Sequence, residues 1–251
     1  MGEIKLISEN RLKYLAGLKG FNLIYLEKDY FLTVLLYLIK DVEDIVFKGG
    51  TALNKIFLNH TRLSEDLDFV CRKNVSMVKN EIVKILQSNK EIFSRFAFEN
   101  ETPEFFRVKV FYRGFFSKSD YVILDVNGKG SVLLPPEKRG VPHFYEEIPK
   151  FVVAVLNPEE LVAEKIRALV MRNQPRDYFD VYVLLKAGYK INFELVKKKL
   201  KEAGQDFEPE RIFKNAQKVY SRWDSEITQL TNKPEEFVTV IKRLEKEFRK
   251  E

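Results

Sequence analysis

The sequence predicts an α/β (α+β) protein with a core built on a mixed sheet, followed by a helical C-terminal domain. Three observations support this fold class. A short apolar run is followed by Gly49-Gly50 and then by residues at helical spacing, strand-like runs dominate the middle third, and apolar residues recur at helical spacing after Asn157. We therefore expect a core over residues 1–156 and a helical domain over residues 157–251.

The first seventy residues predict three helices and two strands. Apolar positions at helical spacing indicate helices within 12–18 and 25–39. The β-branched and aromatic run 44–47 predicts a strand, which the glycine pair ends, and Thr51 can cap the next helix. In the second strand Asp66 and Asp68 alternate with apolar residues, so period-two geometry places both carboxylates on one face.

The rest of the core is predicted to be mainly sheet. A helix over 75–86 precedes strand-like runs at 93–98, 105–112 and 121–126. The many glycines and prolines between 127 and 149 exclude a regular helix and indicate a long loop beside the candidate site. A last strand at 151–155 leads to Asn157-Pro158, a typical helix start.

Composition favours a cytoplasmic protein without a membrane partner. The longest apolar stretch, 30–39, is far shorter than the roughly 20 residues of a membrane helix, and the first residues lack the pattern of a secretory signal. The single cysteine, Cys71, cannot form an internal disulfide, and we expect it to be buried. The net charge of +6 permits a polyanionic partner such as RNA without requiring one.

The acidic strand suggests a divalent metal site. Mg²⁺ prefers one or two carboxylates together with phosphate oxygens and water, and Asp66 and Asp68 supply such a pair for Mg²⁺ or Mn²⁺. Asp125 lies between apolar residues of another predicted strand, which makes it a candidate third metal ligand and a candidate base for an attacking hydroxyl. Asp120 is its nearest competitor.

The glycine pair suggests where a phosphate would bind. Glycines at a strand-to-helix turn let backbone N–H groups approach a phosphate without an intervening Cβ, although the same pattern also occurs in ordinary turns. The order of strand, glycine turn, helix and acidic strand favours the nucleotide site. The candidate nucleotide-binding residues here are Lys48, Gly49, Gly50, Thr51 and Ser64.

Two motif groups resemble the AbiEii/AbiGii toxin family, whose members are nucleotidyltransferases with a polymerase-beta-like core. The first group comprises residues 47–53 (FKGGTAL) and 62–69 (RLSEDLDF). The second comprises residues 160–169 (ELVAEKIRAL), Arg172 and residues 176–182 (RDYFDVY). Both groups occur in the family's order, so the resemblance covers about residues 47–184.

The resemblance implies metal-dependent transfer of a nucleoside monophosphate from an NTP to an acceptor hydroxyl. In related toxins the acceptor is the 3′ end of tRNA, and the toxin belongs to a toxin–antitoxin or abortive-infection system with a cognate antitoxin. By position, Asp66 and Asp68 would bind the metal, and Lys165 would contact the nucleotide phosphates. Asp177 or Asp180 would complete the site from the helical domain.

Helical spacing adds to this assignment. Lys165 and Arg172 lie two turns apart and share a helix face, so both can present cationic groups to a triphosphate. Asp177 and Asp180 also share a face. Without the resemblance, Lys165 would be interpreted as a solvated residue and the segment 176–180 as a structural ion pair.

Several positions have open interpretations. The gap between Gly50 and Asp66 suggests a helix extended by one turn. His60 and His143 lack metal-ligand spacing and are expected at surface or turn positions. The lysine run 197–201, with aromatic residues nearby, is either a solvated helix face or an RNA contact; its companions are Lys214, Lys218, Tyr220, Arg222 and Trp223.

Two other functions remain compatible with the sequence. One is a catalytically silent or regulatory module of the same fold that binds a protein or RNA. The intact acidic and lysine motifs argue against it, because a cluster of carboxylates is costly to keep without a cation. The other is a nucleotidyltransferase whose acceptor is a protein or a small molecule.

Overall fold

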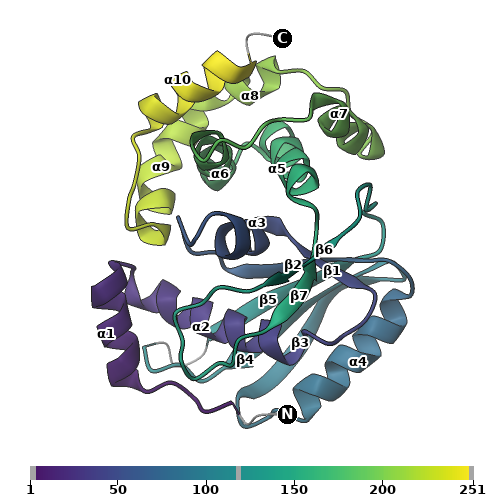
Figure 1. Cartoon of the computed structure of the whole chain (residues 1–251), viewed down its shortest axis with the longest axis vertical. Coiled ribbons are helices and arrows are strands. Elements are labelled where there is room, and N and C mark those ends of the chain that lie inside the picture. The colour runs from purple at the N-terminus through teal and green to yellow at the C-terminus, as the bar shows by residue number, and fades with distance from the viewer. Residues whose placement is uncertain (1–3, 117–119, 249–251) are drawn as a thin grey trace. The chain divides into compact units, whose positions relative to one another are not determined.

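The computed structural model describes residues 4–116 and 120–248. They form two compact units, Met1–Leu156 and Asn157–Glu251 (Figure 1). The first unit contains the sheet and the second is helical. Among the described residues, no helix combines the length and the apolar character needed to cross a bilayer.

A seven-stranded mixed sheet is the centre of the first unit, in the order β3-β4-β5-β2-β1-β7-β6. The β2–β5 and β1–β7 pairs are parallel, and the other pairs are antiparallel. The predicted mixed sheet is confirmed. Its strands are β1 (Ile45–Lys48), β2 (Asp66–Cys71), β3 (Phe93–Thr102), β4 (Phe105–Tyr112), β5 (Asp120–Asn127), β6 (Glu137–Gly140) and β7 (Val152–Val155).

Helices cover one face of this sheet. Asn22 caps α2 (Leu23–Leu38) and Asn74 caps α4 (Val75–Gln87) through their side-chain oxygens. In β4 every second residue is buried, and Phe31 of α2 stacks on Tyr112 of that strand at 3.9 Å between ring centroids. Another helix, α1 (Glu9–Lys19), precedes α2 in the sequence. Apolar burial is thus concentrated on the helix-covered face, and polar side chains are left for the other.

Two segments differ from the sequence-based expectation. The loop predicted over 127–149 contains β6, which pairs antiparallel with β7 at the edge of the sheet. The four residues between Pro136 and Val141 are long enough for an edge strand, which tolerates flanking prolines. The glycines and prolines therefore exclude helix, as expected, but not strand.

The helix after β1 is not extended by a regular turn. It consists of α3 (Gly49–Ala52) followed by a π-helical turn, η1 (Leu53–Phe57). Asn59 and His60 then adopt left-handed backbone conformations, and an irregular segment accounts for the rest of the gap. His60 occupies a turn as expected but is buried against Phe144, and burial is the main reason that its pKa falls to about 3.

Helices make up the described part of the second unit. Pro158 and Pro175 stand at the first positions of the two helices that carry its polar cluster. The core of the unit includes Phe179, Trp223 and Phe237. The helices are α5 (Pro158–Arg172), α6 (Pro175–Lys186), α7 (Phe193–Glu202), α8 (Glu210–Lys214), α9 (Ala216–Leu230) and α10 (Phe237–Phe248).

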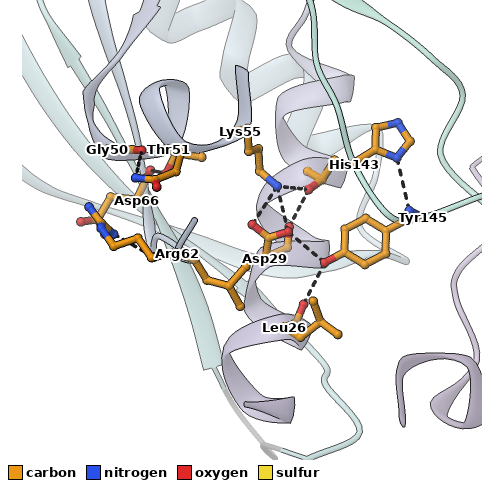
Figure 2. A network of polar contacts seen from close by, with 12 residues as sticks. Leu26, Asp29, Gly50, Thr51, Lys55, Arg62, Asp66, His143 and Tyr145 are labelled. Carbon is orange, nitrogen blue, oxygen red and sulfur yellow. Dashed lines mark hydrogen bonds and ion pairs between the residues drawn. The ribbon is translucent and has the colours of Figure 1, made fainter. Parts of the chain in front are cut away.

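A buried ion pair fastens η1 to α2, as Figure 2 shows. Lys55 Nζ lies 2.7 and 2.8 Å from the two carboxylate oxygens of Asp29 and 3.0 Å from Thr33 Oγ1. The Tyr145 hydroxyl lies 2.9 Å from Asp29 Oδ2 and 3.1 Å from the Leu26 carbonyl oxygen. Lys55 and Asp29 are each about 1% exposed. The two charges are tolerated at this depth because they pair with each other and because Thr33 and Tyr145 add hydrogen bonds.

Lys55→Met should lower the free energy of unfolding by about 3–5 kcal/mol, because it leaves the Asp29 carboxylate buried without a cation. Urea unfolding followed by circular dichroism measures this. Adding Asp29→Leu should recover part of the loss. The control is Lys13→Met, which breaks an exposed pair with Glu9 and should cost less than about 1 kcal/mol. Equal effects at the two lysines would contradict the prediction.

Candidate active site

The turn after β1 brings backbone against a carboxylate. Gly49 has a φ of +76°, and a Cβ added there would lie 2.0 Å from Asp68 Oδ2. Only glycine satisfies both the left-handed backbone and this close approach. At Gly50 an added Cβ would meet Arg62 Nη2 at 3.0 Å and Ser64 Oγ at 3.1 Å. The glycine pair therefore lets the acidic strand pack directly against the turn.

Hydrogen bonds hold the turn to β2. The Thr51 hydroxyl donates to the carbonyl oxygen of Asp66, and Asn54 Nδ2 donates to the carbonyl oxygen of Gly50 at 3.0 Å (Figure 2). Lys48 is paired in register with Asp68 across the β1–β2 ladder, so both lie on the same face of the sheet. Of the candidate nucleotide-binding residues, the set from Lys48 to Thr51 and Ser64 thus lies together around the acidic strand.

Three predicted aspartates share one face of the sheet. Asp66 and Asp68 are two residues apart in β2, and Asp68 is directly opposite Asp125 in the parallel β2–β5 ladder. All three are partly exposed. The competitor Asp120 is an odd number of residues from Asp125 and instead accepts a hydrogen bond from the Tyr112 hydroxyl at 3.1 Å.

Asp125 forms a bidentate ion pair with an arginine in this structure. Arg107 of β4 donates from Nε to Asp125 Oδ1 at 2.8 Å and from Nη2 to Oδ2 at 2.6 Å. The hydrogen bonds to Asp125 raise the pKa of Arg107, and the charges of Asp66 and Asp68 add to this effect. Residues 4–116 and 120–248 contain no group of three His, Cys, Asp or Glu side chains arranged to hold a metal ion.

Sequence reasoning missed Arg107, Lys55 and Arg62. Arg62 is 1% exposed, and its Nη1 donates to the Leu63 carbonyl oxygen at 2.8 Å. Lys55 lies just after the first quoted motif and Arg62 begins the second, but basic residues are usually on the surface, so spacing alone could not have shown their burial. To predict that Arg107 belongs to the site, the β4–β5 register would have to be known, because that register places Arg107 opposite Asp125.

The second unit contains its own polar cluster. Lys165 Nζ of α5 lies 3.2 Å from Asp177 Oδ1 and 2.9 Å from Asp180 Oδ2, both on α6. Arg172 makes a bidentate contact with Asp177, at 2.7 Å from Nε and 2.9 Å from Nη2. The two shared helix faces expected from spacing are therefore present, and these four predicted residues meet.

Neighbouring cations offset the burial of Asp177. Both aspartates have fully buried side chains, while about half of the Arg172 side chain is exposed. Burial alone would raise the pKa of Asp177, but Lys165 and Arg172 outweigh it and hold that pKa below its usual value. The ion-pair interpretation of residues 176–180 thus describes the geometry, and a role in binding phosphates is a separate proposal.

The lysine run in α7 is only partly a solvated face. Lys197, Lys198 and Lys201 are exposed, but Lys199 is completely buried in an ion pair with Glu160. Trp223, expected as a stacking surface for RNA, is buried and donates from Nε1 to the Glu235 carbonyl oxygen at 2.8 Å. Neither Lys199 nor Trp223 can contact RNA in this fold.

Gly49→Ala should destabilise the chain more than Gly188→Ala. Both glycines have positive φ, +76° and +86°, so an alanine at either costs roughly 1–2 kcal/mol of backbone strain. Nothing lies within 4 Å of a Cβ at Gly188, whereas at Gly49 the new Cβ also displaces Asp68. Urea midpoints measured by circular dichroism should separate the two. Equal midpoints would show that the contact with Asp68 does not constrain the turn.

Comparisons with known proteins identify the family. A family model described as "Nucleotidyl transferase AbiEii toxin, Type IV TA system" matches residues 31–245. No curated protein matches the sequence significantly. Among solved structures, MenT4, a nucleotidyltransferase toxin from Mycobacterium tuberculosis H37Rv, matches with a TM-score of 0.70 and 20% identity over 97% of this chain and 89% of that one.

A second structure supports the same fold. JHP933 from Helicobacter pylori matches with a TM-score of 0.57 and 19% identity over 92% of this chain and 95% of that one. At these identities the structural likeness establishes the fold alone, whereas the family model spans most of the chain. The chain therefore belongs to the AbiEii family and is a nucleotidyltransferase toxin of the type IV toxin–antitoxin class.

Proposed function

We propose that this chain transfers a nucleoside monophosphate from an NTP to the 3′ end of tRNA, with Mg²⁺ or Mn²⁺ held by Asp66 and Asp68. We further propose that it acts in the cytoplasm and that a cognate antitoxin counteracts it. The observation that carries the proposal is the acidic pair of β2: Asp66 and Asp68 share one face of the sheet, and Asp68 packs directly against Gly49. Family membership supports the reaction class.

The donor set suits a hard divalent cation. Asp66 and Asp68 are carboxylates, the ligand type that Mg²⁺ prefers, and two such ligands leave coordination positions for phosphate oxygens and water. When bound, the metal would offset the charge of the triphosphate and of the leaving pyrophosphate. The absence of a Cβ at Gly49 lets the Asp68 carboxylate lie directly against the backbone of the turn.

The reaction is in-line substitution at the α-phosphorus. A bond forms between the acceptor hydroxyl oxygen and the α-phosphorus, and the hydroxyl proton passes to solvent. The bond between the α-phosphorus and the bridging oxygen of the β-phosphate breaks, and pyrophosphate leaves. The Ser64 hydroxyl and the Lys48 ammonium lie beside the acidic strand and supply polar contacts for the phosphates. We propose that Lys165 and Arg172, together with Asp177 and Asp180, serve the same reaction.

Label transfer from each of four α-³²P NTPs to total tRNA tests the proposal. Wild-type chain with Mg²⁺ should label tRNA with at least one nucleotide, and Asp66→Asn or Asp68→Asn should lower the rate by at least about a hundredfold, because the metal loses a charged ligand. Lys165→Met should also lower it. The control Asp120→Asn neutralises a carboxylate on the other face of β5 and should retain activity.

Other outcomes lead to the alternatives. Label that appears on protein or on a small molecule, but never on tRNA, would assign a different acceptor to the same chemistry. Nucleotide binding without transfer to any acceptor would favour a catalytically silent or regulatory binding module.

A strip of aromatic and cationic residues supports RNA as the acceptor. It comprises Arg95, Phe111, Lys109 and Tyr121, which the β3–β4–β5 register places on the face that carries Asp125. Arg95 lies 3.9 Å from the Phe111 ring centroid, and Lys109 Nζ lies 4.6 Å from that of Tyr121. Aromatic rings for bases and cations for phosphates are typical of surfaces that bind single-stranded nucleic acid.

Arg95→Met should weaken binding of tRNA about fivefold or more without changing NTP binding, because it removes an exposed cation from this aromatic–cationic strip. The matched control is Lys79→Met. Its ammonium also lies over a ring, Phe98 at 4.4 Å, but α4 places it on the helix-covered face. Filter binding at fixed ionic strength compares the two variants. Equal losses would remove the strip from the acceptor site.

A further inference from the structure

The polar face of the sheet contains a row of charged side chains. In the strand register Asp68 is opposite Asp125, and Asp125 is opposite Arg107, so the three side chains cross β2, β5 and β4 on one face. Asp66 precedes Asp68 by two residues and shares this face. An arginine is therefore built into the row of carboxylates.

The contact between Arg107 and Asp125 occupies the carboxylate. It is bidentate, with both oxygens within 2.8 Å of a guanidinium nitrogen, and the Asp125 side chain is only 14% exposed. A fork-to-fork contact of this kind is among the strongest hydrogen-bonded pairs in proteins. A divalent cation on the same carboxylate would have to displace the guanidinium or accept a positive neighbour at close range.

The fixed charges on this face limit how many cations it can bind. Asp66, Asp68 and Asp125 together carry three negative charges, and Lys48 and Arg107 carry two positive charges. One divalent cation more than offsets the remaining negative charge. A second divalent cation on the same three carboxylates would add two more positive charges beside the fixed guanidinium, so Arg107 disfavours the second ion.

We propose that Arg107 takes the place of a second divalent metal: Asp125 anchors Arg107 and does not ligate a metal, and the chain binds one divalent ion, at Asp66 and Asp68. This inference rests on the proposed metal site. It replaces the expectation that Asp125 is the third metal ligand. Arg107 acts as a positioning residue that provides a permanent positive charge where a second metal would otherwise bind.

Counting Mn²⁺ bound to the full chain tests the inference without measuring activity. Electron paramagnetic resonance of free Mn²⁺ should give one Mn²⁺ per wild-type chain. Arg107→Met frees Asp125 and removes the competing charge, so it should tighten Mn²⁺ binding at least about tenfold or add a second ion. Arg107→Met combined with Asp125→Asn should return to the wild-type value.

Two controls separate the possible causes. Lys129→Met removes an exposed cation paired with Glu104 at 3.3 Å and should leave Mn²⁺ binding unchanged. Asp68→Asn tests the proposed metal site itself: if it binds Mn²⁺ as the wild type does, the proposed site fails.

The inference about Arg107 fails in two other ways. Two Mn²⁺ ions on the wild-type chain would show that the guanidinium yields to a metal, and this measurement does not depend on any variant folding. Mn²⁺ binding to Arg107→Met that equals wild-type binding, with far-ultraviolet circular dichroism unchanged, would show that Arg107 does not control the metal count.

Discussion

The buried ion pair between Lys55 and Asp29 is the constraint on which the proposed site depends. It joins η1 to α2. The helix α3 directly precedes η1 and contains Gly49 and Thr51, which contact the acidic strand. An unpaired charge at this depth costs several kcal/mol, so η1 cannot shift along α2 without a large penalty. The position of the glycine turn against Asp68 is therefore held by this buried interaction of η1 with α2.

The helical unit contains two further buried lysines that are paired with carboxylates. Lys165 bridges two aspartates of α6, and Lys199 of α7 is buried against Glu160 of α5. Apolar packing alone would permit several helix registers, because leucine and valine faces are interchangeable at low cost. A buried lysine accepts only the register that supplies its carboxylates. We infer that these pairs select the helix register of the unit, at the cost of desolvating the charges.

Much of the fold follows from local patterns, whereas the pairing within the site does not. Period-two alternation predicted that Asp66 and Asp68 share a face, and helical spacing predicted the shared faces of α5 and α6. The partner of Asp125 could not be predicted, because it depends on how β4 aligns with β5. The burial of Lys55 and Lys199 could not be predicted either. A lysine is expected at the surface unless a buried partner for its charge is known, and the sequence does not reveal that partner.

The position of Arg107 is a consequence of how the core packs. Phe106, Val108 and Val110 of β4 are completely buried on the helix-covered face of the sheet. Because side chains alternate along a strand, Arg107 must point to the opposite face. A slip of one residue between β4 and β5 would expose these apolar side chains and bury the guanidinium, so the register is strongly specified. The burial of an apolar strand face thus sets the electrostatics of the acidic face, since the same alignment that fills the core also places a positive charge beside Asp125.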